Sequence, residues 1–192
     1  MYNNTAIELL QELNISGDTL YPSLKALSDA NSKYLRDLKL NVKTSLASEA
    51  LGEKDALLVA YAIAVNAKNR ALQEAFYAKA LAAGSTNDEV GEAAAIASLL
   101  SANNVLYRFR HFSNNKKYAE LPARIRMNIM MSPILGKELF ELISLAVSSV
   151  NGCEVCVNSH EHSVRELGAS EEKIFDAIRV AAIVTSLDRI IG

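Results

Sequence analysis

The residues best suited to chemistry gather in one short segment late in the chain. Cys153 and Cys156 are the only two cysteines, and His160 follows Cys156 after three residues. On a helix this spacing places all three side chains on one face. Two thiols one turn apart can join in a disulfide, and an imidazole one turn further on can take up or return a thiol proton near neutral pH. The spacing therefore predicts reversible dithiol chemistry.

The sequence before the cysteines predicts where their helix begins. Asn151-Gly152 interrupts one helical pattern, and the next helix is expected to open at Cys153. Unpaired backbone N–H groups and the positive end of the helix dipole stabilise an anion at such a start. A thiol there loses its proton more easily than its ordinary pKa of about 8.5 implies. This position therefore favours a reactive thiolate.

Glu141 is a candidate partner of His160. It lies in an otherwise apolar stretch, Leu139–Leu145, where an unpartnered carboxylate is costly. If the chain reverses at Asn151-Gly152, Glu141 lies roughly 15 Å before the turn and His160 roughly 12 Å after it, at 1.5 Å per residue. The two side chains would then face each other across an antiparallel helix pair. We predict a proton relay from Glu141 through His160 to Cys156.

Other interpretations of these residues remain open. The cysteine pair could be half of a zinc site, although four ligands usually need a second pair, or it could be two inert buried thiols. His162 points to a different helix face from His160 and is expected to be solvated or to cap a helix. A second cluster is expected at the surface, where it could line an interface: Tyr107, Arg108, Arg110 and His111.

Composition limits the class of protein. The chain has 192 residues, of which 50% are hydrophobic and 22% charged, which excludes a disordered protein. A net charge of −2 offers no field to attract nucleic acid or an anionic membrane. The N-terminus does not resemble a signal peptide, and the longest apolar run, Ala56–Ala67, falls short of the roughly 20 residues of a membrane span. We expect a cytoplasmic protein, where thiols are kept reduced unless they have a catalytic or metal-binding role.

The fold class predicted is all-α. Prolines and glycines are few, helix-forming residues dominate, and no alternating strand pattern of useful length is present. Residues 113–117 should form a surface loop, and one long helical stretch should break near Asn66–Asn69. The expected helices are Thr5–Leu13, Pro22–Leu38, Lys39–Ala50, Lys54–Gly84, Asp88–Phe109, Ala123–Met131, Gly136–Val150, Cys153–Leu167 and Ser170–Ile190.

The sequence also suggests an internal duplication. Segment 62–68 resembles segment 146–152, and segment 79–85 resembles segment 164–170, with an offset of about 84 residues. We predict one domain in three parts: N-terminal helices over residues 1–50, a repeat without cysteines over 51–112, and a repeat with the cysteines over 120–192. Similar composition of alanine-rich helices is the alternative explanation.

The motif resembles a known family. Glu141, eleven residues, Cys153-x-x-Cys156, three residues and His160 are similar to the signature of the alkyl hydroperoxide reductase AhpD family, within the carboxymuconolactone decarboxylase-like group. Similarity extends to Asp37–Val42, Asn103–Arg108, Arg126–Ile129 and Phe140–Val147, and so covers most of the chain. The resemblance implies an all-helical fold in which Cys156 is the more reactive thiol and Cys153 resolves it as a disulfide. The family often has a histidine immediately before the second cysteine, and here that residue is Val155.

The resemblance also implies partners. It implies a homotrimer or larger ring that is reduced by dihydrolipoamide, carried on the lipoyl-bearing acyltransferase of a 2-oxoacid dehydrogenase. Electrons would pass to the peroxiredoxin AhpC, with weak direct reduction of hydroperoxides. No glycine-rich fingerprint for a flavin or nicotinamide is present, so no tightly bound cofactor is expected. The alternative functions are a carboxymuconolactone decarboxylase-type enzyme and a zinc-binding helical interaction protein.

Overall fold

Ten α-helices and one 3₁₀ turn make up the regular structure, and no strand is present. The structure is a computed structural model that describes residues 1–192, and it confirms the all-α prediction. The elements are α1 (Asn4–Glu12), α2 (Pro22–Asp29), α3 (Lys33–Leu46), α4 (Glu53–Ala67), α5 (Arg70–Ala82), α6 (Asn87–Phe112), α7 (Lys117–Glu120), η1 (Asn128–Met130), α8 (Lys137–Val150), α9 (Glu154–Glu166) and α10 (Glu171–Asp188).

Local signals set several helix starts. Thr86 begins α6 with a capping box, in which its hydroxyl accepts the Glu89 N–H and the Glu89 carboxylate accepts the Thr86 N–H. Ser170 caps α10 by accepting the Lys173 N–H. The predicted break in the long helical stretch is confirmed at Lys68, which adopts a left-handed conformation with φ 61°.

Two predicted helical segments were wrong. Pro22–Leu38 is not continuous, because Asn31 has φ 48° and Ser32 caps a new helix, so α3 runs through the predicted boundary at Lys39. Ala123–Met131 is almost entirely irregular and contains only η1. No residue of that stretch is fully buried, and only Ile129 and Met130 pack partly against the core, so no continuous apolar face stabilises a helix there.

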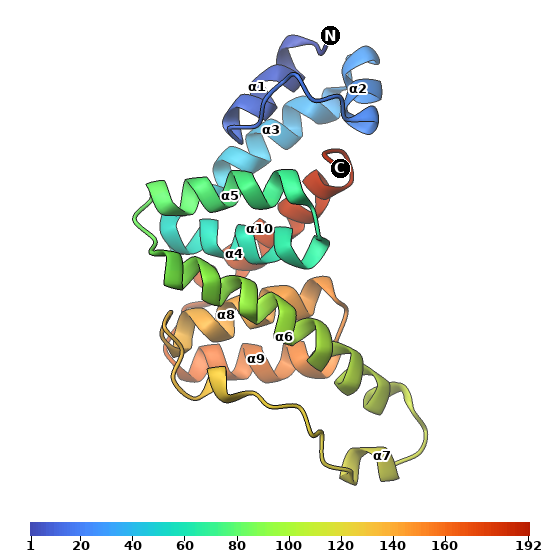
Figure 1. Cartoon of the computed structure of the whole chain (residues 1–192), viewed down its shortest axis with the longest axis vertical. Helices are drawn as coiled ribbons and strands as arrows, with labels where there is room; N and C mark the ends of the chain where they lie inside the picture. Colours follow the sequence, from blue (N-terminus) through green and yellow to red (C-terminus); the bar gives the residue numbers. More distant parts are fainter.

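Helix α4 lies at the centre of the molecule. It packs against α5, α6, α8 and α10, and eight of its residues are buried, including the run Ala56–Ala60. Helices α1–α3 form a separate layer, in which α3 contacts α10 (Figure 1). At the other end of the molecule α9 packs against α8 and α6. The cysteine-bearing helix thus lies between two helices anchored in the core.

The two predicted halves have the same order of elements. Helices α4, α5 and α6 are separated by left-handed residues at Lys68 and Gly84, and α8, α9 and α10 by left-handed residues at Gly152 and Gly168. The same offset of 84 residues separates Lys68 from Gly152 and Gly84 from Gly168. This correspondence supports the duplication, which stays a prediction together with the boundaries of its three parts.

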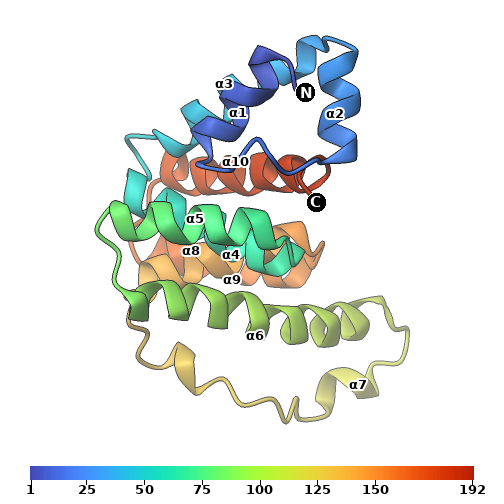
Figure 2. The ribbon, with the colours of Figure 1, turned by 45° about the horizontal axis from the view of Figure 1, so that its top comes forward.

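Residues 113–136, which we call the strap, connect α6 to α8. The strap lies at the end of the molecule opposite α1–α3 and carries α7 and η1 (Figures 1 and 2). Its last part is held by Glu92 of α6, whose carboxylate accepts the N–H groups of Ile134 and Leu135 at 2.9 and 2.7 Å. None of the helices combines the length and apolar character needed to cross a bilayer.

Candidate active site

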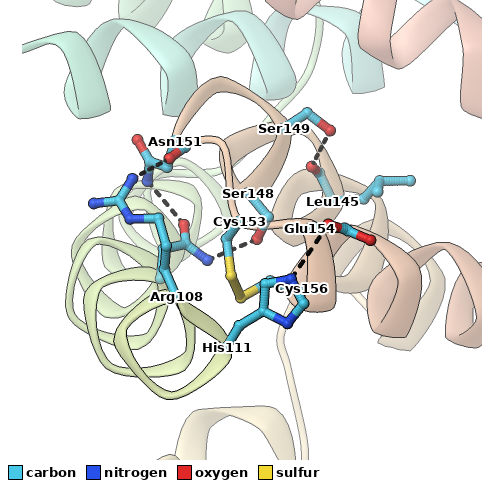
Figure 3. The surroundings of a disulfide bond; sticks show 10 residues. Arg108, His111, Leu145, Ser148, Ser149, Asn151, Cys153, Glu154 and Cys156 are labelled. Carbon is cyan, nitrogen blue, oxygen red and sulfur yellow. Dashed lines mark hydrogen bonds and ion pairs between the residues drawn. A yellow bond between two sulfur atoms is a disulfide. The ribbon is translucent and has the colours of Figure 1, made fainter. Parts of the chain in front are cut away.

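The two cysteines open α9 and are joined to each other. Cys153 is the N-cap residue of α9, and Cys156 lies in its first turn. Their Cα atoms are 5.3 Å apart and their sulfurs form a disulfide (Figure 3). Gly152, with φ 67°, provides the left-handed reversal between α8 and α9. The predicted pairing of the cysteines is confirmed.

The two sulfurs differ in their access to solvent. Cys153 is fully buried, whereas Cys156 is 6% exposed. Cys156 lines a mainly apolar cavity of about 340 Å³, and Cys153 does not. A molecule entering this cavity therefore meets Cys156 first. The cavity is lined by Leu100, Asn103, Tyr107, Met127, Met130, Val155, Cys156, Ser159 and His160.

Glu141 and His160 meet across the antiparallel pair of α8 and α9. The Nδ1 atom of His160 lies 2.6 Å from Oε2 of Glu141, and both side chains are largely buried. His160 also lines the cavity that contains Cys156. The carboxylate can hold the imidazole in one orientation. The structure thus brings together all four predicted site residues, while the transfer of a proton along them stays a prediction.

A polar network supports the turn before Cys153. Asn104 of α6 donates to Ser148 Oγ at 3.0 Å and accepts from the Asn151 amide at 2.8 Å. Asn151 also exchanges hydrogen bonds with Asn66 of α4, and the Cys153 N–H donates to the Ser148 carbonyl. The turn is therefore fixed by both halves of the chain. The sequence identified Asn151 as part of the turn but did not predict the contacts that Asn104, Ser148 and Asn66 make with it, although polar side chains on a buried helix face were a usable signal.

Several residues of the cluster at the end of α6 lie beside the site. Tyr107 lines the cavity, and Arg110 donates to the carbonyl of Leu121 in the strap. Arg108 donates to the Asn151 carbonyl at 2.5 Å. His111, whose side chain is 39% exposed, lies 3.3 Å from a carboxylate oxygen of Glu154 (Figure 3). The sequence did not predict these contacts, and the expectation that this cluster could line an interface stays a prediction.

Two further predictions concern metal binding and His162. No three histidine, cysteine or acidic side chains are grouped so that they could hold a metal ion, so nothing in the structure supports the zinc alternative. His162 is exposed, and it lines a second cavity beside Glu141 instead of the disulfide cavity, which His160 lines.

Comparison with known sequences agrees with this geometry. The helical fold with a disulfide at the start of α9 is that of a carboxymuconolactone decarboxylase-type protein, and the pattern of the carboxymuconolactone decarboxylase (CMD) family matches residues 116–190. Alkyl hydroperoxide reductase AhpD of Rhizorhabdus wittichii is 40% identical over 163 residues, which are 84% of this chain and 93% of that protein. AhpD of Solibacter usitatus is 42% identical over 169 residues, 88% and 94% of the two chains. AhpD of Anaeromyxobacter dehalogenans is 43% identical over 162 residues, 84% and 87%.

The chain belongs to the alkyl hydroperoxide reductase AhpD family. The predicted family and the predicted enzyme class are therefore confirmed. The similarity covers both halves of the chain and not only the segment around the cysteines.

Proposed function

We propose that the chain is a dithiol reductase that uses Cys153 and Cys156 to reduce alkyl hydroperoxides, directly and through a peroxiredoxin. The observation that carries this proposal is the disulfide at the start of α9, with one sulfur on an apolar cavity. The names of its relatives support the same activity. An apolar cavity suits the alkyl part of such a substrate.

The direct reaction has two steps. The Cys156 thiolate attacks the terminal oxygen of the hydroperoxide, the O–O bond breaks, and the alcohol leaves with a proton while Cys156 becomes a sulfenic acid. The Cys153 thiolate then attacks the Cys156 sulfur and water leaves as the disulfide forms. The resemblance implies these roles, and the cavity beside Cys156 supports them. Two thiols thus reduce one hydroperoxide to an alcohol and water.

Glu141 and His160 would serve as the proton relay. His160 lies one turn from Cys156 on α9 and can accept the thiol proton before attack and return it to the leaving oxygen. Glu141, 2.6 Å from Nδ1, holds the ring in orientation and stabilises its charged form. Proton transfer by such a group typically contributes about 10²–10⁴-fold to a rate.

A second dithiol must restore the cysteines. We propose dihydrolipoamide on a lipoyl-bearing acyltransferase as this donor and the peroxiredoxin AhpC as the acceptor. A disulfide at a helix start is readily reduced, because the thiolate it releases is stabilised there. A difference of about 30 mV from the donor corresponds to only about 1.4 kcal/mol, so electrons could pass in either direction.

The test is a thiol count followed by turnover with dihydrolipoamide and a hydroperoxide, with and without a peroxiredoxin. Mild oxidation should remove both thiols and dihydrolipoamide should restore them. Cys156→Ser should abolish turnover, and His160→Phe or Glu141→Phe should slow it by about 10²–10⁴-fold. Glu161→Phe, at an exposed position of the same helix, is the matched control. Turnover at the wild-type rate in either relay variant would refute the relay.

The same variants address the decarboxylase alternative, which is favoured only by the CMD family pattern. A lactone decarboxylase does not need a cysteine pair, so Cys153→Ser should leave such an activity largely intact. Loss of hydroperoxide turnover in Cys153→Ser, with no lactone decarboxylation by the wild type, would decide for the reductase.

We also propose that the chain forms a homotrimer, as the family resemblance implies. Exposed apolar side chains at the end of α6 and in the strap support association: Val105, Phe109, Phe112, Tyr118 and Leu121 are 38–69% exposed. Light scattering should give three times the mass of one chain, and Phe112→Glu should lower it. A monomer in the wild type would refute the proposal. The predicted cytoplasmic location stays a prediction.

A further inference from the structure

Helix α6 holds the chain on both sides of Cys153. Arg108 binds the carbonyl of Asn151, two residues before Cys153. His111 lies one turn further along the same face of α6, and its Nε2 atom is 3.3 Å from Oε2 of Glu154, the residue that follows Cys153 (Figure 3). These contacts are separate from the Glu141–His160 pair, which reaches α9 from α8. Each cysteine thus has an imidazole–carboxylate pair of which one member lies on α9 within four residues of it.

The position of Glu154 has an electrostatic cost for the reduced protein. Its carboxylate lies in the first turn of α9, beside the residue on which a thiolate forms when the disulfide opens. A nearby negative charge disfavours a second one and raises the pKa of a thiol. A protonated imidazole paired with the carboxylate offsets that charge. Removing the imidazole should therefore make the Cys153 thiolate less stable.

We propose that His111 is a positioning residue that acts through Glu154 to stabilise the Cys153 thiolate. This inference deepens the proposed dithiol function and rests on it. During reduction, a thiolate of the donor dithiol attacks Cys156, the S–S bond breaks and its electron pair leaves on Cys153. The second donor thiolate then attacks the mixed disulfide and Cys156 leaves. The donor departs as a cyclic disulfide, and its two protons pass to the two cysteines.

Three charged or titratable side chains belong to, or bind, the residues on either side of Cys153, while Tyr107 and His160 lie on the cavity at Cys156. Arg108 and His111 come from α6, and Glu154 comes from α9. Arg110 is directed to the strap, where it binds the Leu121 carbonyl. Arg108 supplies a constant positive charge, so the variable part of the balance is the pair of His111 and Glu154.

The experiment titrates one thiol at a time by the ultraviolet absorbance of its thiolate. In a Cys156→Ser background only Cys153 titrates. We expect His111→Gln to raise the pKa of the Cys153 thiol by about half a unit, about a threefold change in the ratio of thiolate to thiol. Glu154→Gln should lower it by a similar amount, and His111→Gln should have a smaller effect when combined with Glu154→Gln. His162→Gln is the matched control.

Two results would overturn the inference. One is a Cys153 pKa in His111→Gln that equals that of His162→Gln. The other is an equal shift of the Cys156 thiol in a Cys153→Ser background, since that would indicate a general disturbance of α9. The titration needs no turnover, so its outcome is separate from the proposed function. Absence of hydroperoxide turnover in the wild type would refute the function and leave the thiol measurement valid.

Discussion

Replacing Glu92 should release the strap from α6. The carboxylate is 5% exposed and accepts two backbone N–H groups, at 2.9 Å from Ile134 and 2.7 Å from Leu135. Glu92→Gln leaves one amide oxygen for two donors and places an NH₂ group against a backbone N–H. Glu92→Ala removes both acceptors. Because the strap carries Met127 and Met130 of the cavity wall, the change should affect the site without touching its reacting atoms.

The size of the effect follows from these two hydrogen bonds. A hydrogen bond to a charged group contributes about 1.5–3 kcal/mol, and a buried donor left without a partner costs about 1–3 kcal/mol. Replacing the carboxylate also removes the cost of burying its charge, which offsets part of this loss. We therefore expect local opening of the strap to become easier by about 1–3 kcal/mol in Glu92→Gln. Glu92→Ala should have a larger effect, because both acceptors are lost.

Hydrogen exchange of the Ile134 and Leu135 amides measures this opening directly. Exchange from a locally opened state should become about 10–100-fold faster, since about 1.4 kcal/mol corresponds to tenfold. Glu120→Gln, on the exposed α7 of the strap, is the matched control. Unchanged protection of both amides in Glu92→Ala would refute the reasoning.

Three further predictions concern stability. The hydrogen bond with Lys54 and the Thr86 N–H lower the pKa of Glu89, so its carboxylate stabilises the fold above about pH 4.5. The difference in the free energy of unfolding between pH 6 and pH 3 should therefore be smaller in Glu89→Gln by about 0.5–1 kcal/mol. Because Lys68 is left-handed, Lys68→Gly should raise the free energy of unfolding by about 1 kcal/mol. Gly152→Ala should lower it by about 1–2 kcal/mol, and urea unfolding measures both changes. Asn104→Ala should lower the free energy of unfolding by about 1–2 kcal/mol in the same assay.

The positions of the helices could be predicted from the sequence more reliably than the structure of the irregular segments. Apolar periodicity and caps identified α4, α6, α8, α9 and α10 within a few residues, because these helices are stabilised by burial of a face that the sequence displays. Residues 113–117 of the strap were predicted as a loop, and only its Ala123–Met131 segment was predicted as a helix. Its exposed residues gain nothing from helix packing, and composition alone does not reveal that.

The reactive residues of the site were also more predictable than the residues that hold them in place. Cys153, Cys156 and His160 lie within eight residues, so helical spacing alone relates them. Asn104 binds Ser148 before the disulfide and His111 lies against Glu154 beside it, both from a helix more than forty residues earlier in the chain. Their role depends on how α6 packs against α9, which is a tertiary contact without a local sequence pattern.

The Glu141–His160 pair lies between two cavities, and this position separates the cavity proposed for the substrate from the cavity through which a proton can reach the pair. His160 lines the apolar cavity of Cys156, whereas Glu141 lines a second, more polar cavity of about 400 Å³ together with Lys137, His162 and Glu166. An apolar pocket around Cys156 suits an alkyl chain but holds few groups that could deliver a proton. Since His160 touches Glu141, a proton can enter from the polar side while the substrate occupies the other. We therefore expect Glu141 to be needed for proton supply and not for substrate binding.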